Sequence, residues 1–232
     1  VVSSVCKILQ VGGTAATNQV LLDSFQRVLS KWKEHGSELD RLSLVDAISS
    51  FTSAADSALI SILNDPVTTE AWLTLGTKPK LKAAVLVSVS QVLDVRHAEA
   101  DDAGSMVRRR LFATIGKVNQ STSTMDLLMS LLKSPIPEIR QGSYAVLEAM
   151  AKIGNGSSQV LIMHPEFLPH ILSRDVETSV DGVKAKYAVV EAVVADTTVM
   201  GLLSDGIIAK LRTFVDQGAH YMQSQSWEVA TE

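Results

Sequence analysis

Cysteine is almost absent from this 232-residue sequence, and its histidines are scattered. Cys6 is the only cysteine, so no internal disulfide can form, which favours a reducing compartment and leaves no set of thiolates for a structural zinc site. His164 and His170 lie six residues apart with Pro165 and Pro169 between them, and this spacing does not place both on one helical face. We therefore expect neither a metal nor any other cofactor.

Long hydrophobic runs are also missing. The longest apolar stretches, 83–89 and 187–195, are interrupted by Ser88 and Glu191 and fall well short of the roughly 18 to 20 residues that a membrane span requires. The first residues carry no charged segment ahead of an apolar run, so we predict no signal peptide and interpret the chain as a fragment of a longer protein. A membrane is accordingly not among the expected partners.

The sequence lacks the common catalytic motifs. It contains no G-x-S-x-G elbow, phosphate-binding P-loop, dinucleotide-binding glycine fingerprint or H-E-x-x-H zinc motif. The glycine pair at 12–13 is interpreted as a turn, the pair at 154 and 156 as a helix end, and Cys6 as a small buried residue rather than a nucleophile. These absences predict a protein that is not an enzyme, with an enzyme carrying a cryptic site as an alternative.

Small apolar residues in helical periodicity dominate what is present. Hydrophobic residues make up 46% of the chain and its mean hydropathy is +0.19, which without a membrane span indicates helices that are buried on more than one side. The apolar residues of 139–153 recur at intervals of three, four and seven, which predicts a helix. Similar patterns predict helices at 18–34, 39–52, 55–63, 80–94, 104–118, 123–133, 157–163, 165–173, 180–195 and 205–216.

The sequence also repeats itself. An offset of 43 residues lays Tyr144–Met150 on Tyr187–Val193 with five of seven positions identical, and such an offset is typical of HEAT and armadillo units. We therefore predict one all-α domain over 1–232, a HEAT/armadillo-like right-handed α-solenoid of stacked helix pairs. Its clearest repeats are expected at about 123–154 and 165–196. A weaker third copy places Ala84–Val89 on Ala145–Met150, with 67–77 interpreted as an insertion.

One stripe of the repeated helix is a candidate protein-binding surface. Small residues at Gly142, Ala145 and Ala149 are expected to let a neighbouring helix approach closely. Beside them runs a polar stripe that recurs in the second copy, formed by Gln141, Tyr144 and Glu148 and then by Lys184, Tyr187 and Glu191. In a solenoid such a stripe can line the concave side and recognise a protein. Alternatively, the two tyrosines pack between units and hydrogen-bond a neighbouring backbone.

Charge is distributed unevenly along the chain. The net charge of −4 divides into −3 over 1–77, +4 over 78–118 and −5 over 119–232. The basic middle contains the run Arg108, Arg109 and Arg110. We do not expect nucleic-acid binding, because the whole chain is acidic and no aromatic side chains are interleaved with the charges. The run is interpreted either as a solvated helix face or as a surface for an acidic protein.

Several segments near the C-terminus carry a resemblance to a known family. They are His164-Pro165-Glu166-Phe167, Ser173-Arg174-Asp175, Lys184-Ala185-Lys186-Tyr187 and Leu211-Arg212-Thr213-Phe214, followed by Gly218 and Tyr221. Together they resemble the closing region of the proteasome non-ATPase regulatory subunit 5 family, and the similarity extends over about 125–222. Because members of that family are longer than this chain, the resemblance implies a C-terminal fragment.

The resemblance also implies a function. Members of the family are non-catalytic assembly chaperones of the proteasome regulatory-particle base, which bind the C-terminal domain of an ATPase subunit and leave before the particle is complete. We therefore expect a monomeric chaperone in the cytoplasm, with the nucleus as a second location. The alternative from another class is a general HEAT/armadillo scaffold or transport adaptor.

Overall fold

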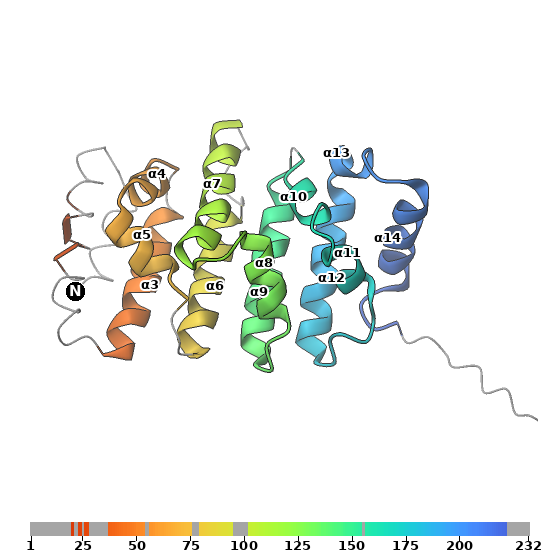
Figure 1. Cartoon of the computed structure of the whole chain (residues 1–232), viewed down its shortest axis with the longest axis horizontal. Coiled ribbons are helices and arrows are strands. Elements are labelled where there is room, and N and C mark those ends of the chain that lie inside the picture. The colour runs from red at the N-terminus through yellow and green to blue at the C-terminus, as the bar shows by residue number, and fades with distance from the viewer. Residues whose placement is uncertain are drawn as a thin grey trace, which may run out of the picture.

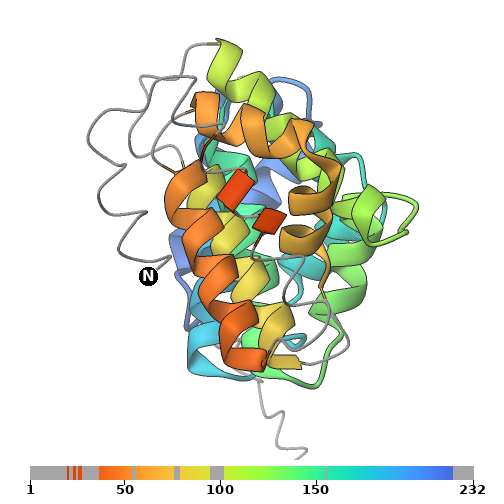
Figure 2. The ribbon, with the colours of Figure 1, turned by 90° about the vertical axis from the view of Figure 1, so that its left-hand side faces the viewer.

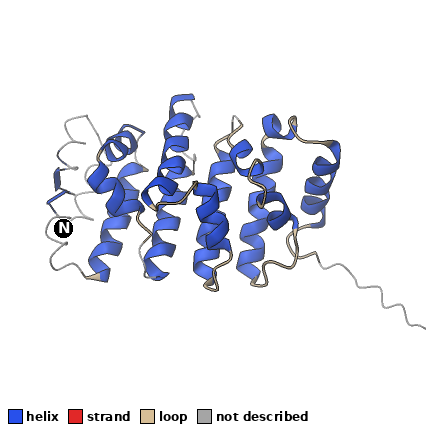
Figure 3. Ribbon diagram, in the orientation of Figure 1, coloured by secondary structure: helices blue, strands red, loops and turns tan. Residues whose placement is uncertain are grey.

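The computed structural model describes residues 20, 23–24, 26–27, 37–53, 56–75, 79–94, 102–154 and 156–221. Within these residues every regular element is a helix and none is a strand, as Figure 3 shows, so the predicted all-α class is confirmed. The helix predicted at 18–34 falls mostly outside the described residues, and Cys6 falls outside them altogether.

Long helices lie side by side in a row that gives the molecule its length (Figure 1). The row consists of α3 (Glu38–Thr52), α6 (Pro79–Leu93), α9 (Pro137–Lys152), α12 (Val180–Ala195) and α14 (Asp205–Gln217). The connecting helices form a second layer along this row, seen end-on in Figure 2. They are α4 (Asp56–Asn64), α5 (Pro66–Leu73), α7 (Asp102–Val118), α8 (Thr124–Leu132), α10 (Ser158–Ile162), α11 (Phe167–Leu172) and α13 (Thr197–Met200). This arrangement is consistent with an α-solenoid.

Local sequence signals fix where the helices begin and end. Ser37 and Asp40 form a reciprocal capping box at the start of α3. Ser123 and Ser179 cap α8 and α12 by accepting hydrogen bonds from backbone N–H groups in the first turn. At the end of α14, Gly218 has φ 79°, a left-handed conformation that glycine adopts without a steric penalty. The helix boundaries therefore follow from residues within one turn of each end.

Most of the segment interpreted as an insertion forms α5, Pro66–Leu73, which is an integral part of the stack. Asp65 and Pro66 start α5, whose Trp72 is completely buried and donates a 2.8 Å hydrogen bond from Nε1 to Oγ of Ser88 on α6. The insertion interpretation is therefore wrong. The longer interval between α6 and α9 instead contains α7, which at 17 residues is longer than α4 or α10.

Gly142 allows α9 to approach α6 closely, as the small-residue pattern predicts. A β-carbon at Gly142 would stand 2.8 Å from Cβ of Leu86, closer than carbon atoms pack. Leu86 is itself buried, and its β-carbon is next to the backbone, so the clash could be relieved only by moving one helix away from the other. The spacing of the row at this point depends on the absence of a side chain.

We predict that Gly142→Val lowers the free energy of unfolding by about 2 kcal/mol or more, because the added methyl groups force α6 and α9 apart. Gly206→Val is the matched control, since a β-carbon at Gly206 in α14 would meet nothing within 4 Å. The control should change stability by less than about 0.5 kcal/mol. Urea denaturation of both variants measures the difference, and equal losses would contradict the close contact.

Candidate functional site

Two hollows open on the row of long helices. The first has a volume of about 560 Å³ and lies across α3, α6 and α9; the second, of about 380 Å³, lies between α9 and α12. We call the surface that carries both hollows the open face. Its residues are Leu42, Val45, Asp46, Ser49, Ala83, Ala84, Val87, Ser88, Gln91, Glu138, Gln141, Gly142 and Ala145 around the first hollow, and Glu148, Ala151, Lys152, Gly154, Ala188, Glu191, Ala192, Ala195 and Asp196 around the second.

The polar members of the predicted stripe lie on or beside this face. Gln141 lines the first hollow, and Glu148 and Glu191 line the second. Lys184 is exposed on α12, four residues and therefore about one turn before Ala188. The structure thus brings these four positions to one surface, where binding to a partner stays a prediction.

The two tyrosines of the stripe point between units instead. Tyr144 has no exposed surface, and its hydroxyl is hydrogen-bonded over 2.9 Å to Nε2 of His170 on α11. Tyr187 is half-buried and donates a 3.0 Å hydrogen bond to the carbonyl oxygen of Val215 on α14. Burial raises the pKa of the Tyr144 hydroxyl and lowers the pKa of the His170 ring, because both sit away from solvent. Tyr144 therefore offers no surface to a partner protein. Its hydrogen bond instead connects α9 to α11.

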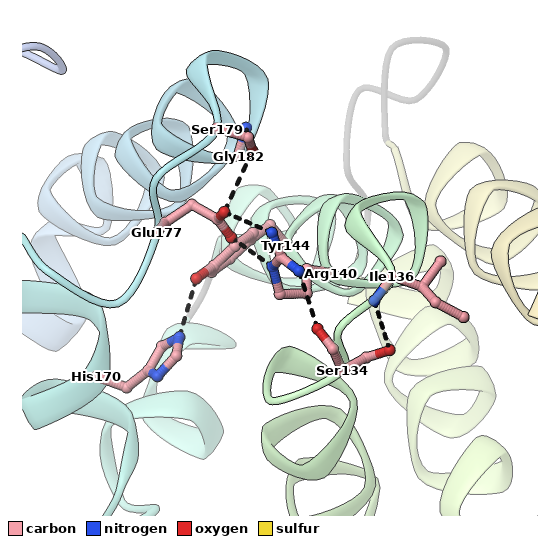
Figure 4. Close-up of polar contacts among 8 residues, drawn as sticks. All are labelled: Ser134, Ile136, Arg140, Tyr144, His170, Glu177, Ser179 and Gly182. Atoms are coloured by element: carbon pink, nitrogen blue, oxygen red, sulfur yellow. Dashed lines mark hydrogen bonds and ion pairs between the residues drawn. The ribbon is translucent and has the colours of Figure 1, made fainter.

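An ion pair between the half-buried Arg140 and the buried Glu177 joins α9 to the loop before α12 (Figure 4). Nε and Nη2 of Arg140 donate to the two carboxylate oxygens of Glu177 over 2.9 and 2.8 Å, and the hydroxyl of Ser179 donates to the same carboxylate over 3.2 Å. Nη1 of Arg140 reaches the carbonyl oxygen of Ser134 at 2.9 Å. Glu177 is only 4% exposed, and these donors, Arg140 above all, hold the pKa of its carboxyl below the usual range.

Sequence reasoning missed this pair. Arg140 and Glu177 are 37 residues apart, and a charged residue in a loop gives no signal of burial. The one related sequence feature is Gly182, since a side chain at that position would collide with Glu177 and Ser179.

The arginine run of α7 contacts α4 on one side and the residues just before α10 on the other. Arg108 forms a 2.9 Å ion pair with Asp56 of α4, and its side chain is 12% exposed. Arg109 donates from Nε to Oγ of Ser157 over 2.9 Å, just ahead of α10. Arg110 donates from Nη2 to Oδ1 of Asn64 over 2.8 Å at the end of α4. The guanidinium groups thus hold helices together, and only Arg110 is exposed.

Residues that carry the family resemblance meet where α12 packs on α14. Nη1 of Arg174 donates to the carbonyl oxygen of Gly218 over 2.8 Å, and its guanidinium carbon lies 3.6 Å from the centre of the Phe214 ring. Lys186 is 2% exposed and donates from Nζ to the carbonyl oxygen of Ser173. Burial, with a contribution from nearby Arg174, lowers the pKa of Lys186 to about 8. These residues hold neighbouring helices together inside the stack.

Metal ligands do not gather anywhere in the described part of the chain, where no three His, Cys, Asp or Glu side chains come together. None of the helices in that part combines the length and the apolar character needed to cross a membrane.

Comparison with known proteins gives the family. A model of the family described as proteasome non-ATPase 26S subunit matches residues 70–232. The chain belongs to this family. It is also similar to the human 26S proteasome non-ATPase regulatory subunit 5, with 22% identity over 147 residues. The aligned region covers 63% of this chain but only 28% of the human protein, and no solved structure matches the chain. The resemblance found in the C-terminal segments is confirmed.

We predict that Arg140→Ala destabilises the protein by about 3 kcal/mol near neutral pH, because it leaves the Glu177 carboxylate buried without its partner. The pKa of a paired carboxyl is lowered, so the pair stabilises the fold above the ordinary glutamate value of 4.5 and is lost as the pH falls through the lowered pKa. The stability difference between the native chain and the variant should therefore shrink below about pH 4.5. Urea denaturation measured from neutral to acidic pH checks this, and a constant difference would refute it.

Lys186 gives a prediction at alkaline pH. The folded chain releases its proton near pH 8 and the unfolded chain near 10.5, so between these values the unfolded state binds more protons. Raising the pH through this window should therefore stabilise the native chain relative to Lys186→Met, which has no titrating group there. Urea denaturation of the two proteins at several alkaline pH values measures this. If the difference between their free energies of unfolding does not change with pH, Lys186 keeps its ordinary pKa.

Proposed function

We propose that this chain is a non-catalytic assembly chaperone of the proteasome regulatory-particle base, and that it binds the C-terminal domain of one proteasomal ATPase subunit. The observation that carries the proposal is the family match over residues 70–232. The human relative bears the name of a non-ATPase regulatory subunit of the 26S proteasome, which supports a role beside the ATPases rather than as one of them.

We further propose that the row of helices is a right-handed HEAT/armadillo-like solenoid continuous over 1–232, with repeats at about 123–154 and 165–196. In support, α9 begins at Pro137 and α12 at Val180, an interval equal to the 43-residue offset of the sequence repeat. The equivalent residues Tyr144 and Tyr187 each form a hydrogen bond to a helix further along the chain, α11 and α14 respectively. These observations support a recurring unit of one long helix with its second-layer helices.

The open face is the surface proposed to hold the ATPase domain. It is built entirely from the long helices and the residues that directly follow α9 and α12, so a folded domain can lie along it without displacing the second layer. Contacts such as Arg140–Glu177 fix neighbouring units relative to each other. A surface that is ordered before binding loses less conformational entropy on binding. The chaperone would act by shielding, because a bound ATPase subunit is sterically kept from premature contact with the core particle.

Catalysis is not part of the proposal. Among the residues that the structure describes, the groups with the largest pKa shifts are Tyr144 and Lys186, which are buried between helices and line neither hollow. A catalytic site normally places such groups where a substrate can reach them. We propose that the protein works as a monomer in the cytoplasm, with the nucleus as a second location, and without nucleic acid, membrane or cofactor.

The proposal predicts that the purified chain binds the C-terminal domain of one proteasomal ATPase with a dissociation constant in the micromolar range or below. Isothermal titration calorimetry against each ATPase C-terminal domain measures this. A small GTPase and an unfolded peptide serve as controls, since a general scaffold or transport adaptor would prefer one of them. Absence of binding to every ATPase domain would refute the proposal.

A further inference from the structure

The floor of the open face is made of small apolar groups. In the first hollow these include Ala84, Val87 and Ala145, and in the second Ala188 and Ala192. Small side chains leave room above the helix backbones, so side chains of a partner can enter and exclude water there. The volumes of about 560 and 380 Å³ are large enough for side chains rather than for water alone.

Acidic groups dominate the charge around this floor. Asp46 and Glu138 line the first hollow, and no lysine or arginine does. In the second hollow Glu148 forms an ion pair with Lys152, and this leaves the exposed Glu191 and the buried Asp196 as further carboxylates. The backbone N–H of Val199 donates to Asp196 over 3.3 Å, so Asp196 caps α13. Both hollows therefore carry a net negative charge, with Asp46, Glu138 and Glu191 exposed to solvent.

The shape of the face sets the length of what it can hold. The hollows extend from α3 to α12, which are separated by three helix-to-helix steps of about 8 to 10 Å each. A helix lying across them would be about 25 to 30 Å long and, at 1.5 Å per residue, would need about 16 to 20 residues. Its side toward the face would have to carry small or slender apolar side chains flanked by positive charges.

We propose that the open face binds a basic amphipathic helix of a partner protein, with lysine or arginine side chains reaching Asp46, Glu138 and Glu191. The identity of that partner rests on the proposed function, in which the helix belongs to the C-terminal domain of an ATPase subunit. A second copy of this chain fits poorly, because the chain is acidic overall and two open faces would repel each other. The phosphates of nucleic acids and anionic lipids would be repelled in the same way.

Charge reversal of the three exposed carboxylates tests the electrostatic part. The triple variant Asp46→Lys, Glu138→Lys and Glu191→Lys should weaken binding of the ATPase domain about tenfold or more. The matched control reverses Glu70, Asp175 and Asp216, which are exposed carboxylates outside both hollows. It changes the net charge equally and should leave affinity within about twofold. Binding to the native chain should also weaken as the ionic strength is raised from about 0.05 to 0.5 M.

Filling the hollows tests the apolar part. Ala145→Trp and Ala188→Trp place a bulky ring in the first and second hollow respectively. Each should reduce affinity at least about tenfold, while the melting temperature shows that the fold is kept. If an ATPase domain binds the native chain but neither the charge reversals nor these substitutions weaken it, the inference is overturned and the proposed function stands.

A synthetic probe separates the inference from the proposed function. The probe is a helical peptide of about 18 residues with an alanine and leucine stripe flanked by lysines, compared with a peptide that has glutamate in place of each lysine. If no ATPase domain binds, selective binding of the basic peptide that is lost in the triple variant would support the inference alone. Equal binding of both peptides, or binding of neither, would overturn it. Self-association abolished by Ala145→Trp in sedimentation experiments would assign the face to a second copy and overturn it as well.

Discussion

Close packing between neighbouring long helices is the constraint on which the rest of this structure depends. Each helix buries one side against the second layer and its flanks against the next long helix, and no single unit could bury its apolar surface alone. At the junction of α6 and α9 the separation is set by Gly142 against Leu86. Because the open face is the outer surface of the same row, the spacing that forms the core also sets the width of the hollows.

Polar contacts between units add direction to this packing. The free energy gained by burying apolar surface is proportional to the buried area, and it does not by itself fix the angle between two helices. The bidentate pair of Arg140 with Glu177 requires its two charged groups to meet in one geometry, and the hydrogen bonds of Tyr144 and Tyr187 add further fixed points. A buried pair of this kind is weak evidence for net stability, since desolvation offsets much of the attraction. Its effect here is to define how one unit sits on the next.

The sequence was sufficient for most of the helices and their periodicity, but not for the short helices α5 and α13 or for the roles of individual polar residues. Helix ends depend on caps such as Ser37 and Gly218, which act within one turn and can therefore be read locally. Tyr144 lies on a stripe with the partly exposed Gln141 and Glu148, yet its side chain turns into the junction with α11, where its hydroxyl is hydrogen-bonded to His170. The partners of Arg109 and Arg140 lie 48 and 37 residues away, and no local pattern encodes such distances.

The residues that carry the family resemblance join helices inside the stack, and they are not the residues that line the open face. Arg174, Lys186 and Phe214 hold α12 and α14 together, and replacing any of them would disturb several contacts at once. The floor of the open face needs only small side chains, and its rim needs only negative charge, which many residues can supply. A surface with such loose requirements can be adapted to one partner by exchanging exposed carboxylates, while the buried junctions that hold it in shape remain unchanged.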